Sequence, residues 1–154
     1  MKTKALWILF AVFLVAASHS SASQQDNQVQ TKMALCDAGI VNFCFDAAVA
    51  LSEQEDPEEP VQTLKYSRLA CDGGRQDACR YEAITAHLAG NAINQRIVKT
   101  LINGDPKGKW KYKSDLNAAI DRAIAYYQRA QKRDQSLSDD WPALYASLEK
   151  HRQN

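Results

Sequence analysis

Residues 36–44 read CDAGIVNFC, and residues 71–79 read CDGGRQDAC. Each stretch has two cysteines with seven residues between them, and the second stretch starts 35 residues after the first. Similar apolar text follows both copies, AAVAL at residues 47–51 and EAITA at residues 82–86. A repeat near 35 residues is typical of stacked helical hairpins. The chain is therefore predicted to be an all-α solenoid of two-helix repeats, with about three hairpins.

The first 22 residues have the composition of a secretory signal peptide. Lys2 and Lys4 supply a basic start, residues 6–17 are uninterruptedly apolar, and Ser20-Ser21-Ala22 offers small residues for cleavage. The apolar run is shorter than the roughly 20 residues that span a bilayer. We expect cleavage after Ala22, a mature domain at residues 23–154 without a transmembrane segment, and a periplasmic or secreted location. An uncleaved anchor is the alternative.

Charge and cysteine usage narrow the class of protein further. Loss of two lysines with the signal peptide changes the formal net charge from +1 to −1, which argues against nucleic-acid binding. In an oxidising compartment, an even number of spaced cysteines indicates disulfides. Zinc sites usually place ligands two to four residues apart, often with histidine, whereas residues 23–154 hold only His87 and His151. We expect neither a metal nor a cofactor.

Helix geometry selects the disulfide pairing. In one continuous helix the Cα atoms of Cys36 and Cys44 would lie about 12 Å apart, whereas a disulfide requires about 4.4–6.8 Å. The chain must therefore reverse between them, and Gly39 suits such a helix end, as does Gly73-Gly74 in the second copy. A bridge between equivalent cysteines of successive hairpins would span at least one helix packing distance, about 8–10 Å. We predict two bridges, Cys36–Cys44 and Cys71–Cys79.

The cysteine pattern defines two hairpins. The first combines a helix that ends near Asp37 with one that begins near Val41. The second combines a helix that begins after Pro60, a residue suited to the first helical turn, with one over residues 76–89. Gly90-Asn91 is expected to end that last helix.

A third hairpin comes late in the chain. The text AIAYYQRA at residues 123–130 aligns with TLKYSRLA at residues 63–70, at an offset of 60 instead of 35. About 25 residues are therefore inserted, and we place this insert at residues 92–113, with a short helix over residues 93–102. The third hairpin is expected to pair residues 115–132, with Ser114 as N-cap, and residues 139–151.

At these residues the chain resembles the Sel-like repeat branch of the tetratricopeptide superfamily, and most of all its disulfide-bearing members, the Helicobacter cysteine-rich proteins. The first helix of that repeat reads Ala-x-x-x-Tyr-x-x-Ala, which Ala123, Tyr127 and Ala130 match. The turn Cys-Asp-x-Gly with its partner cysteine is matched by residues 70–79 and less fully by residues 36–44. The resemblance covers residues 30–89 and 115–150.

The resemblance implies a right-handed solenoid whose concave side binds peptides or proteins. Family members include exported scaffolds of envelope assemblies, and some cysteine-rich members are described as penicillin-binding β-lactamases. We therefore expect an exported, non-catalytic interaction or scaffold module with a protein or peptide partner in the envelope. A β-lactamase-like hydrolase is the first alternative, and a small immunity or inhibitor protein is the second.

The insert supplies the first candidate contact surface. It alternates lysines with aromatic rings, in the order Lys109, Trp110, Lys111, Tyr112 and Lys113. Stacking area beside positive charge suits an acidic peptide, an anionic glycan or a lipid head group. A solvated loop whose rings cover the third hairpin is the alternative. The acidic run at residues 53–59 could complement a basic partner, but a solvated connection is the preferred interpretation.

Candidate catalytic residues are few. Ser147 and Lys150 fit the Ser-x-x-Lys pattern of serine β-lactamases, but no Lys-Thr-Gly or Ser-Asp-Asn partner accompanies them. His87 has an acidic neighbour, Glu82, without an evident serine or cysteine nucleophile. Since nothing assembles a nucleophile, a base and an oxyanion site, no catalytic residue is predicted.

Three tyrosines fall at positions expected to lie in the core of the repeats: Tyr66, Tyr126 and Tyr127. We expect their rings to pack inside and their hydroxyl groups to bond backbone groups.

Overall fold

The computed structural model describes residues 25–103 and 113–152, and this part of the chain consists of helices and short connections, without strands. The first helix covers residues 25–37. The later elements are α2 (Asn42–Ser52), α3 (Val61–Asp72), α4 (Gln76–Asn103), α5 (Lys113–Arg133), the short 3-10 helix η1 (Gln135–Leu137) and α6 (Trp141–Glu149). The predicted all-α class is confirmed. The expected signal peptide, residues 1–22, lies outside the described residues.

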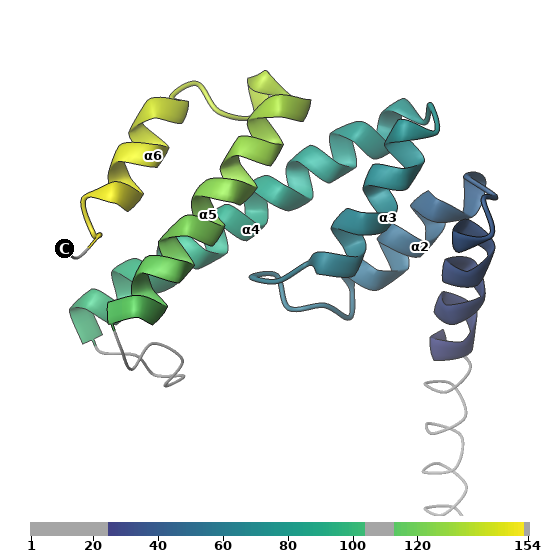
Figure 1. The fold of residues 1–154 in the computed structure, drawn as a ribbon, viewed down its shortest axis with the longest axis horizontal. Helices are drawn as coiled ribbons and strands as arrows, with labels where there is room; N and C mark the ends of the chain where they lie inside the picture. Colours follow the sequence, from purple (N-terminus) through teal and green to yellow (C-terminus); the bar gives the residue numbers. More distant parts are fainter. Residues whose placement is uncertain (1–24, 104–112, 153–154) are drawn as a thin grey trace, which may run out of the picture.

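Each helix packs mainly on its neighbours in the chain, α2 on α3, α3 on α4, α4 on α5 and α5 on α6 (Figure 1). The buried residues form two clusters. One is built from the first helix, α2, α3 and the start of α4, and the other mainly from α4, α5 and α6. This nearest-neighbour order is compatible with a helical-repeat solenoid.

Both predicted disulfides are present. The Cα atoms of Cys36 and Cys44 lie 4.8 Å apart, and those of Cys71 and Cys79 lie 4.6 Å apart. The chain reverses between the cysteines at two left-handed glycines, Gly39 with φ 90° and Gly74 with φ 96°. A side chain would find open space at both positions, so the requirement for glycine comes from the backbone conformation alone.

Helix α4 shows that the expected stop at Gly90-Asn91 is wrong. The helix continues without interruption to Asn103, so residues 92–103 of the expected insert extend α4 and form no separate helix. Gly90 is buried, and a Cβ atom there would lie 2.6 Å from Cε1 of Tyr127. The missing side chain therefore allows α5 to approach α4 closely. Asn91 accepts a 2.8 Å hydrogen bond from the Tyr127 hydroxyl.

The third hairpin also differs at its boundaries. Helix α5 begins at Lys113, so Ser114 lies within the helix and does not cap it. Helix α6 begins at Trp141, and its N-cap is Asp140, whose carboxylate accepts a 2.9 Å hydrogen bond from the amide of Ala143.

Replacing Gly90 with alanine tests the close approach of α4 and α5. Alanine improves helix propensity by about 1 kcal/mol, but overpacking against a buried ring costs about 1–3 kcal/mol. We expect a net loss of about 1 kcal/mol in the free energy of unfolding, measured by urea denaturation. In a Tyr127→Leu background, which lacks the ring atoms, the same Gly90→Ala change should stabilise. Equal effects in both backgrounds would contradict this explanation.

The predicted burial and hydrogen bonding of the three tyrosines are only partly confirmed. Tyr66 and Tyr127 are fully buried, as predicted, whereas Tyr126 is partly buried. The hydroxyl groups of the two buried rings bond side chains and not the backbone: Tyr66 donates to Asp37 at 2.9 Å and Tyr127 to Asn91 at 2.8 Å. These hydroxyl groups bond side chains because each ring extends from its own hairpin to the neighbouring one, where its hydroxyl group meets a polar side chain.

The aspartates that follow Cys36 and Cys71 make equivalent links between hairpins. Asp37 pairs with Lys65 of α3 at 3.0 Å, and Asp72 pairs with Arg133 of α5 at 3.0 Å. Hydrogen bonds from these cations hold the pKa of each carboxyl below its ordinary value. Each Cys-Asp dipeptide therefore provides a disulfide within its own hairpin and an ion pair to the next hairpin.

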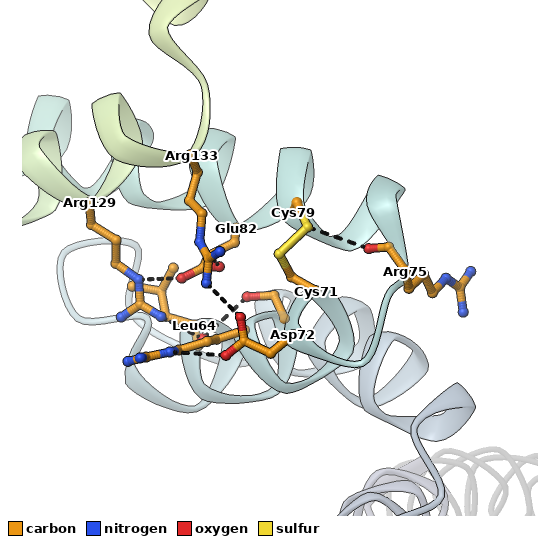
Figure 2. Close-up of polar contacts among 10 residues, drawn as sticks. Leu64, Cys71, Asp72, Arg75, Cys79, Glu82, Arg129 and Arg133 are labelled. Atoms are coloured by element: carbon orange, nitrogen blue, oxygen red, sulfur yellow. Dashed lines mark hydrogen bonds and ion pairs between the residues drawn. A yellow bond between two sulfur atoms is a disulfide. The ribbon is translucent and has the colours of Figure 1, made fainter.

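A buried carboxylate joins the second hairpin to the third. Glu82 of α4 is 1% exposed and meets two arginines of α5, Arg129 at 2.6 Å and Arg133 at 2.9 Å (Figure 2). Arg129 also donates to the carbonyl oxygen of Leu64 at 2.8 Å. The guanidinium groups thereby connect α3, α4 and α5 at one point.

The acidic run at residues 53–59 is held against the fold and is not simply a solvated connection. Glu55 accepts hydrogen bonds of 2.7 Å from the amides of Gln62 and Thr63, so it caps the N-terminus of α3. Glu58 pairs with Arg96 of α4 at 3.1 Å, and both side chains are largely buried. Two acids of this run are therefore engaged within the chain.

Candidate interaction surface

The predicted contact residues of the insert cannot be placed. Lys109, Trp110, Lys111 and Tyr112 lie outside the described residues, and Lys113 is described only as the first residue of α5. Their role in binding stays a prediction.

The candidate catalytic residues do not form a site together. Glu82 turns to the arginines of α5, while His87 lies between two rings, 5.8 Å from that of Tyr127 and 5.6 Å from that of Trp141. Ser147 is partly buried in α6, and Lys150 is exposed just beyond the end of that helix. Neither of the hollows described below is lined by Ser147 or Lys150.

Within residues 25–103 and 113–152, no group of three or more His, Cys, Asp or Glu side chains is arranged to hold a metal ion. Over the same residues, no helix combines the length and the apolar character that crossing a membrane requires.

The aromatic surroundings of His87 predict a pH dependence of stability. Burial lowers the pKa of His87 in the folded chain, so the unfolded chain binds the proton more readily. The stability contributed by the neutral ring is fully present above the unfolded pKa, about 6.5, and is lost as the pH falls from there towards the folded pKa. We expect the urea concentration at half-unfolding to decrease when the pH is lowered from 7.5 to 5.5. The decrease should be smaller in His87→Gln.

His151 provides the matched control, because burial and Lys150 also lower its pKa. A His151→Gln variant should retain the share of the pH effect that belongs to His87. An unchanged drop in the urea midpoint of His87→Gln would contradict the assignment.

Among the described residues, five of the nine exposed large apolar side chains lie on α4: Ile84, Leu88, Val98, Leu101 and Ile102. We call the helix face that carries four of them, Ile84, Leu88, Val98 and Ile102, the outer face of α4. It adjoins the side that packs on α5, where His87 and Asn91 contact Tyr127. Ile102 is 73% exposed and Leu88 is 58% exposed. Ile84 and Ile102 are 18 residues apart, which corresponds to five turns and about 27 Å along the helix. The four side chains therefore follow one line along the helix, in two pairs about 15 Å apart, with the exposed Gln95 between the pairs.

A hollow of about 290 Å³ opens beside the first half of this face. We call it the α4 hollow, and it lies between α4 and the α2–α3 connection. Its lining is Ser52, Glu55, Pro57, Pro60, Tyr81, Ile84, Thr85 and Leu88. Tyr81 is held edge-on to the ring of Phe45 at 5.4 Å between centroids, and Arg75 covers the same ring at 4.2 Å. Together with the Glu55 cap and the Glu58–Arg96 pair, these contacts fix the walls of the hollow.

A second hollow, of about 330 Å³, lies between the first helix and α2. Its lining is mostly polar or charged and includes Gln25, Gln28, Lys32, Asp46 and Glu53. It offers little apolar surface to a partner and borders residues outside the described range.

Comparisons of the chain with protein-family models, with curated proteins and with solved structures find no match. The surface therefore has to be interpreted from its own chemistry.

Sequence reasoning missed the outer face of α4 because it ended the helix at Gly90. With a break there, Ile84 and Leu88 have no fixed relation to Val98 and Ile102. The signal was nevertheless present, since the spacing of these residues matches helical turns across the glycine.

Proposed function

We propose that this chain is an exported, non-catalytic protein-interaction module of the Sel-like repeat type, and that a protein partner docks on the outer face of α4. The observation that carries the proposal is the exposed aliphatic stripe beside the α4 hollow. Large apolar side chains exposed along one helix face, beside a hollow with apolar lining, suit contact with another molecule.

Export is part of the proposal. It is supported by the two disulfides, which persist in oxidising compartments, and by the composition of residues 1–22. The disulfides, the Glu55 cap and the buried ion pairs would hold the surface in its binding shape, so that less conformational entropy is lost on association.

The insert is a second place for a partner to bind. Trp110 and Tyr112 follow the end of α4 in the chain, so one partner could contact both the outer face of α4 and the insert. The sequence pattern of lysines and rings, and no structural observation, supports this extension.

The test uses residues 23–154 with both disulfides formed, immobilised and exposed to envelope extract. Four forms are compared: the unaltered chain, Leu88→Glu, Trp110→Ala/Tyr112→Ala, and the control Val61→Glu. Val61 is 62% exposed at the start of α3 and does not line the α4 hollow. A retained protein is identified by mass spectrometry, purified and measured against all four forms.

We expect Leu88→Glu to weaken binding of the purified partner at least about tenfold, which corresponds to about 1.4 kcal/mol, and Val61→Glu to leave it unchanged. Equal binding by Leu88→Glu and Val61→Glu would remove the outer face of α4 from consideration. Turnover of a chromogenic β-lactam by the purified chain, lost in Ser147→Ala, would favour the hydrolase alternative instead.

A further inference from the structure

Helix α6 lies at one end of the packed helices and has α5 as its main neighbour (Figure 1). Its contacts with the rest of the fold include two buried side chains, Trp141 at 2% exposed and Leu148 at 0%. The Tyr145 hydroxyl also donates a 2.7 Å hydrogen bond to Gln131 of α5. A terminal element that packs mainly on one neighbour can open while the other helices stay folded.

The only two histidines of residues 23–154 lie at the two ends of α6. The ring of His87, in α4, lies 5.6 Å from that of Trp141, the first residue of α6. His151 follows Glu149, the last residue of α6, by two positions. Histidine is the side chain whose ordinary pKa places its change of charge between pH 5 and 8. Both ends of α6 therefore meet a group that mild acid can charge.

The contacts of His87 require a neutral ring. The side chain of Asn91 lies between His87 and Tyr127: its Oδ1 accepts the 2.8 Å hydrogen bond from the Tyr127 hydroxyl, and its Nδ2 lies 3.5 Å from Nε2 of His87. An amide nitrogen only donates, so Nε2 of His87 has to offer a lone pair. A proton on Nε2 would place two donors opposite each other, beside the buried ring of Trp141.

The carboxylates on the elements around His87 have other partners. Glu82 of α4 pairs with two arginines of α5. Asp134 and Asp140 accept hydrogen bonds from backbone amides as the N-caps of η1 and α6, and Arg80 of α4 acts on Asp134. Burial therefore lowers the pKa of His87 without an ion pair to oppose it among the described residues.

At the other end of α6, His151 is equally unsuited to a charge. Its Nε2 atom is buried and has no hydrogen-bond partner within the described residues. Burial lowers the pKa of His151, and the neighbouring charge of Lys150 lowers it further. The two carboxylates that meet this end of the chain, Asp121 and Glu149, bind Arg152 at 2.7 Å and 2.6 Å. A charged imidazole would have neither water nor an acceptor at Nε2 while α6 is docked.

We propose that acid releases α6 from α4 and α5 while the other helices stay folded, and that His87 and His151 take up the protons. In the released form both rings are in water and regain their ordinary pKa of about 6.5. The docked form therefore has its full stability above that pH and loses stability as the pH falls towards the lower pKa values of the docked rings. Release would expose Trp141 and Leu148, so the chain would present this apolar surface only in acid.

Hydrogen exchange measured by mass spectrometry tests whether the release is local. Residues 23–154, with both disulfides formed, are compared at pH 7.5 and 5.5 after correction for the intrinsic exchange rate. Each histidine that binds its proton only in the released form raises the opening constant by up to about tenfold over this range. We expect the protection of residues 135–152 to fall by about tenfold, and that of residues 64–97 to change far less.

The exposure of Trp141 gives a second readout. A Trp110→Phe background leaves Trp141 as the single tryptophan of residues 23–154, so that quenching of its fluorescence by acrylamide reports release. The double variant His87→Gln/His151→Gln carries no charge at these positions and should keep Trp141 protected at pH 5.5. His87→Lys is charged at both pH values and should expose Trp141 already at pH 7.5. Circular dichroism shows whether each variant remains helical.

Three results would overturn the inference. An equal loss of protection in residues 64–97 would mean that acid unfolds the whole chain and not α6 alone. Unchanged protection of residues 135–152 at pH 5.5 would mean that α6 stays docked. An undiminished response to acid in His87→Gln/His151→Gln would assign the response to carboxylates instead of the two histidines.

Discussion

Replacing Glu82 with glutamine is expected to lower the free energy of unfolding by about 3 kcal/mol. The carboxylate is 1% exposed and is the shared partner of Arg129 and Arg133. Glutamine keeps the size of the side chain but removes the negative charge, so two guanidinium groups lose their buried counter-charge. Their side chains are only 32% and 25% exposed, so water replaces the lost interaction incompletely.

The matched control is Asp72→Asn, because Asp72 pairs with the same Arg133 at 3.0 Å but its side chain is 51% exposed. Exposed ion pairs stabilise a fold only weakly, so this variant should lower the free energy of unfolding far less than Glu82→Gln does. Urea denaturation at pH 7 gives both values. Equal losses in the two variants would show that burial of Glu82 is not what makes its ion pairs important.

The features that sequence reasoning identified correctly depend on local geometry. Cysteines with seven residues between them cannot be bridged along one helix, so the reversals at Gly39 and Gly74 followed from the reach of a disulfide. The helix starting after Pro60 followed from the fixed backbone of proline in the same way.

The feature that was missed depends on a contact across the fold. A glycine after a helical stretch suits both a helix end and a close approach of two helices. Only the ring of Tyr127, 37 residues later in the chain, distinguishes the two at Gly90. The error at one residue concealed the candidate surface, since the outer face of α4 exists only when the helix is continuous.

Charged residues show the same limit. Glu82 was considered as a neighbour of His87, but residues five apart on a helix point in different directions, and Glu82 meets arginines from α5 instead. Glu55 was assigned to a solvated loop, whereas it caps α3 seven residues later. In both cases the partner is set by how the helices pack, which the local pattern does not contain.

Removal of both disulfides is expected to have the largest effect on stability. Each closes a short loop, and the loss of chain entropy in the unfolded state corresponds to about 2.5 kcal/mol per bridge. The variants are Cys36→Ala/Cys44→Ala, Cys71→Ala/Cys79→Ala and the combination of all four changes. The combined loss in the free energy of unfolding, about 5 kcal/mol, equals the low end of the stability of a whole domain. The variant with all four cysteines replaced should therefore be partly unfolded at 37 °C.

The two bridges should differ in which residues they protect. Cys36–Cys44 joins the first described helix, residues 25–37, to α2, and Asp37 at the end of that helix contacts Lys65 and Tyr66 of α3. Its loss should mainly open residues 25–52, since a terminal hairpin has a neighbour on one side only. Cys71–Cys79 belongs to the first buried cluster and lies beside the Glu82 ion pairs that join α4 to α5 (Figure 2), so its loss should loosen the helices on both sides. Hydrogen exchange measured by mass spectrometry distinguishes these outcomes, because local opening raises exchange in residues 25–52 alone, whereas global destabilisation raises it in α4 and α5 as well. Uniform increases in both paired variants would mean that the whole chain unfolds as one unit and that position along the array does not matter.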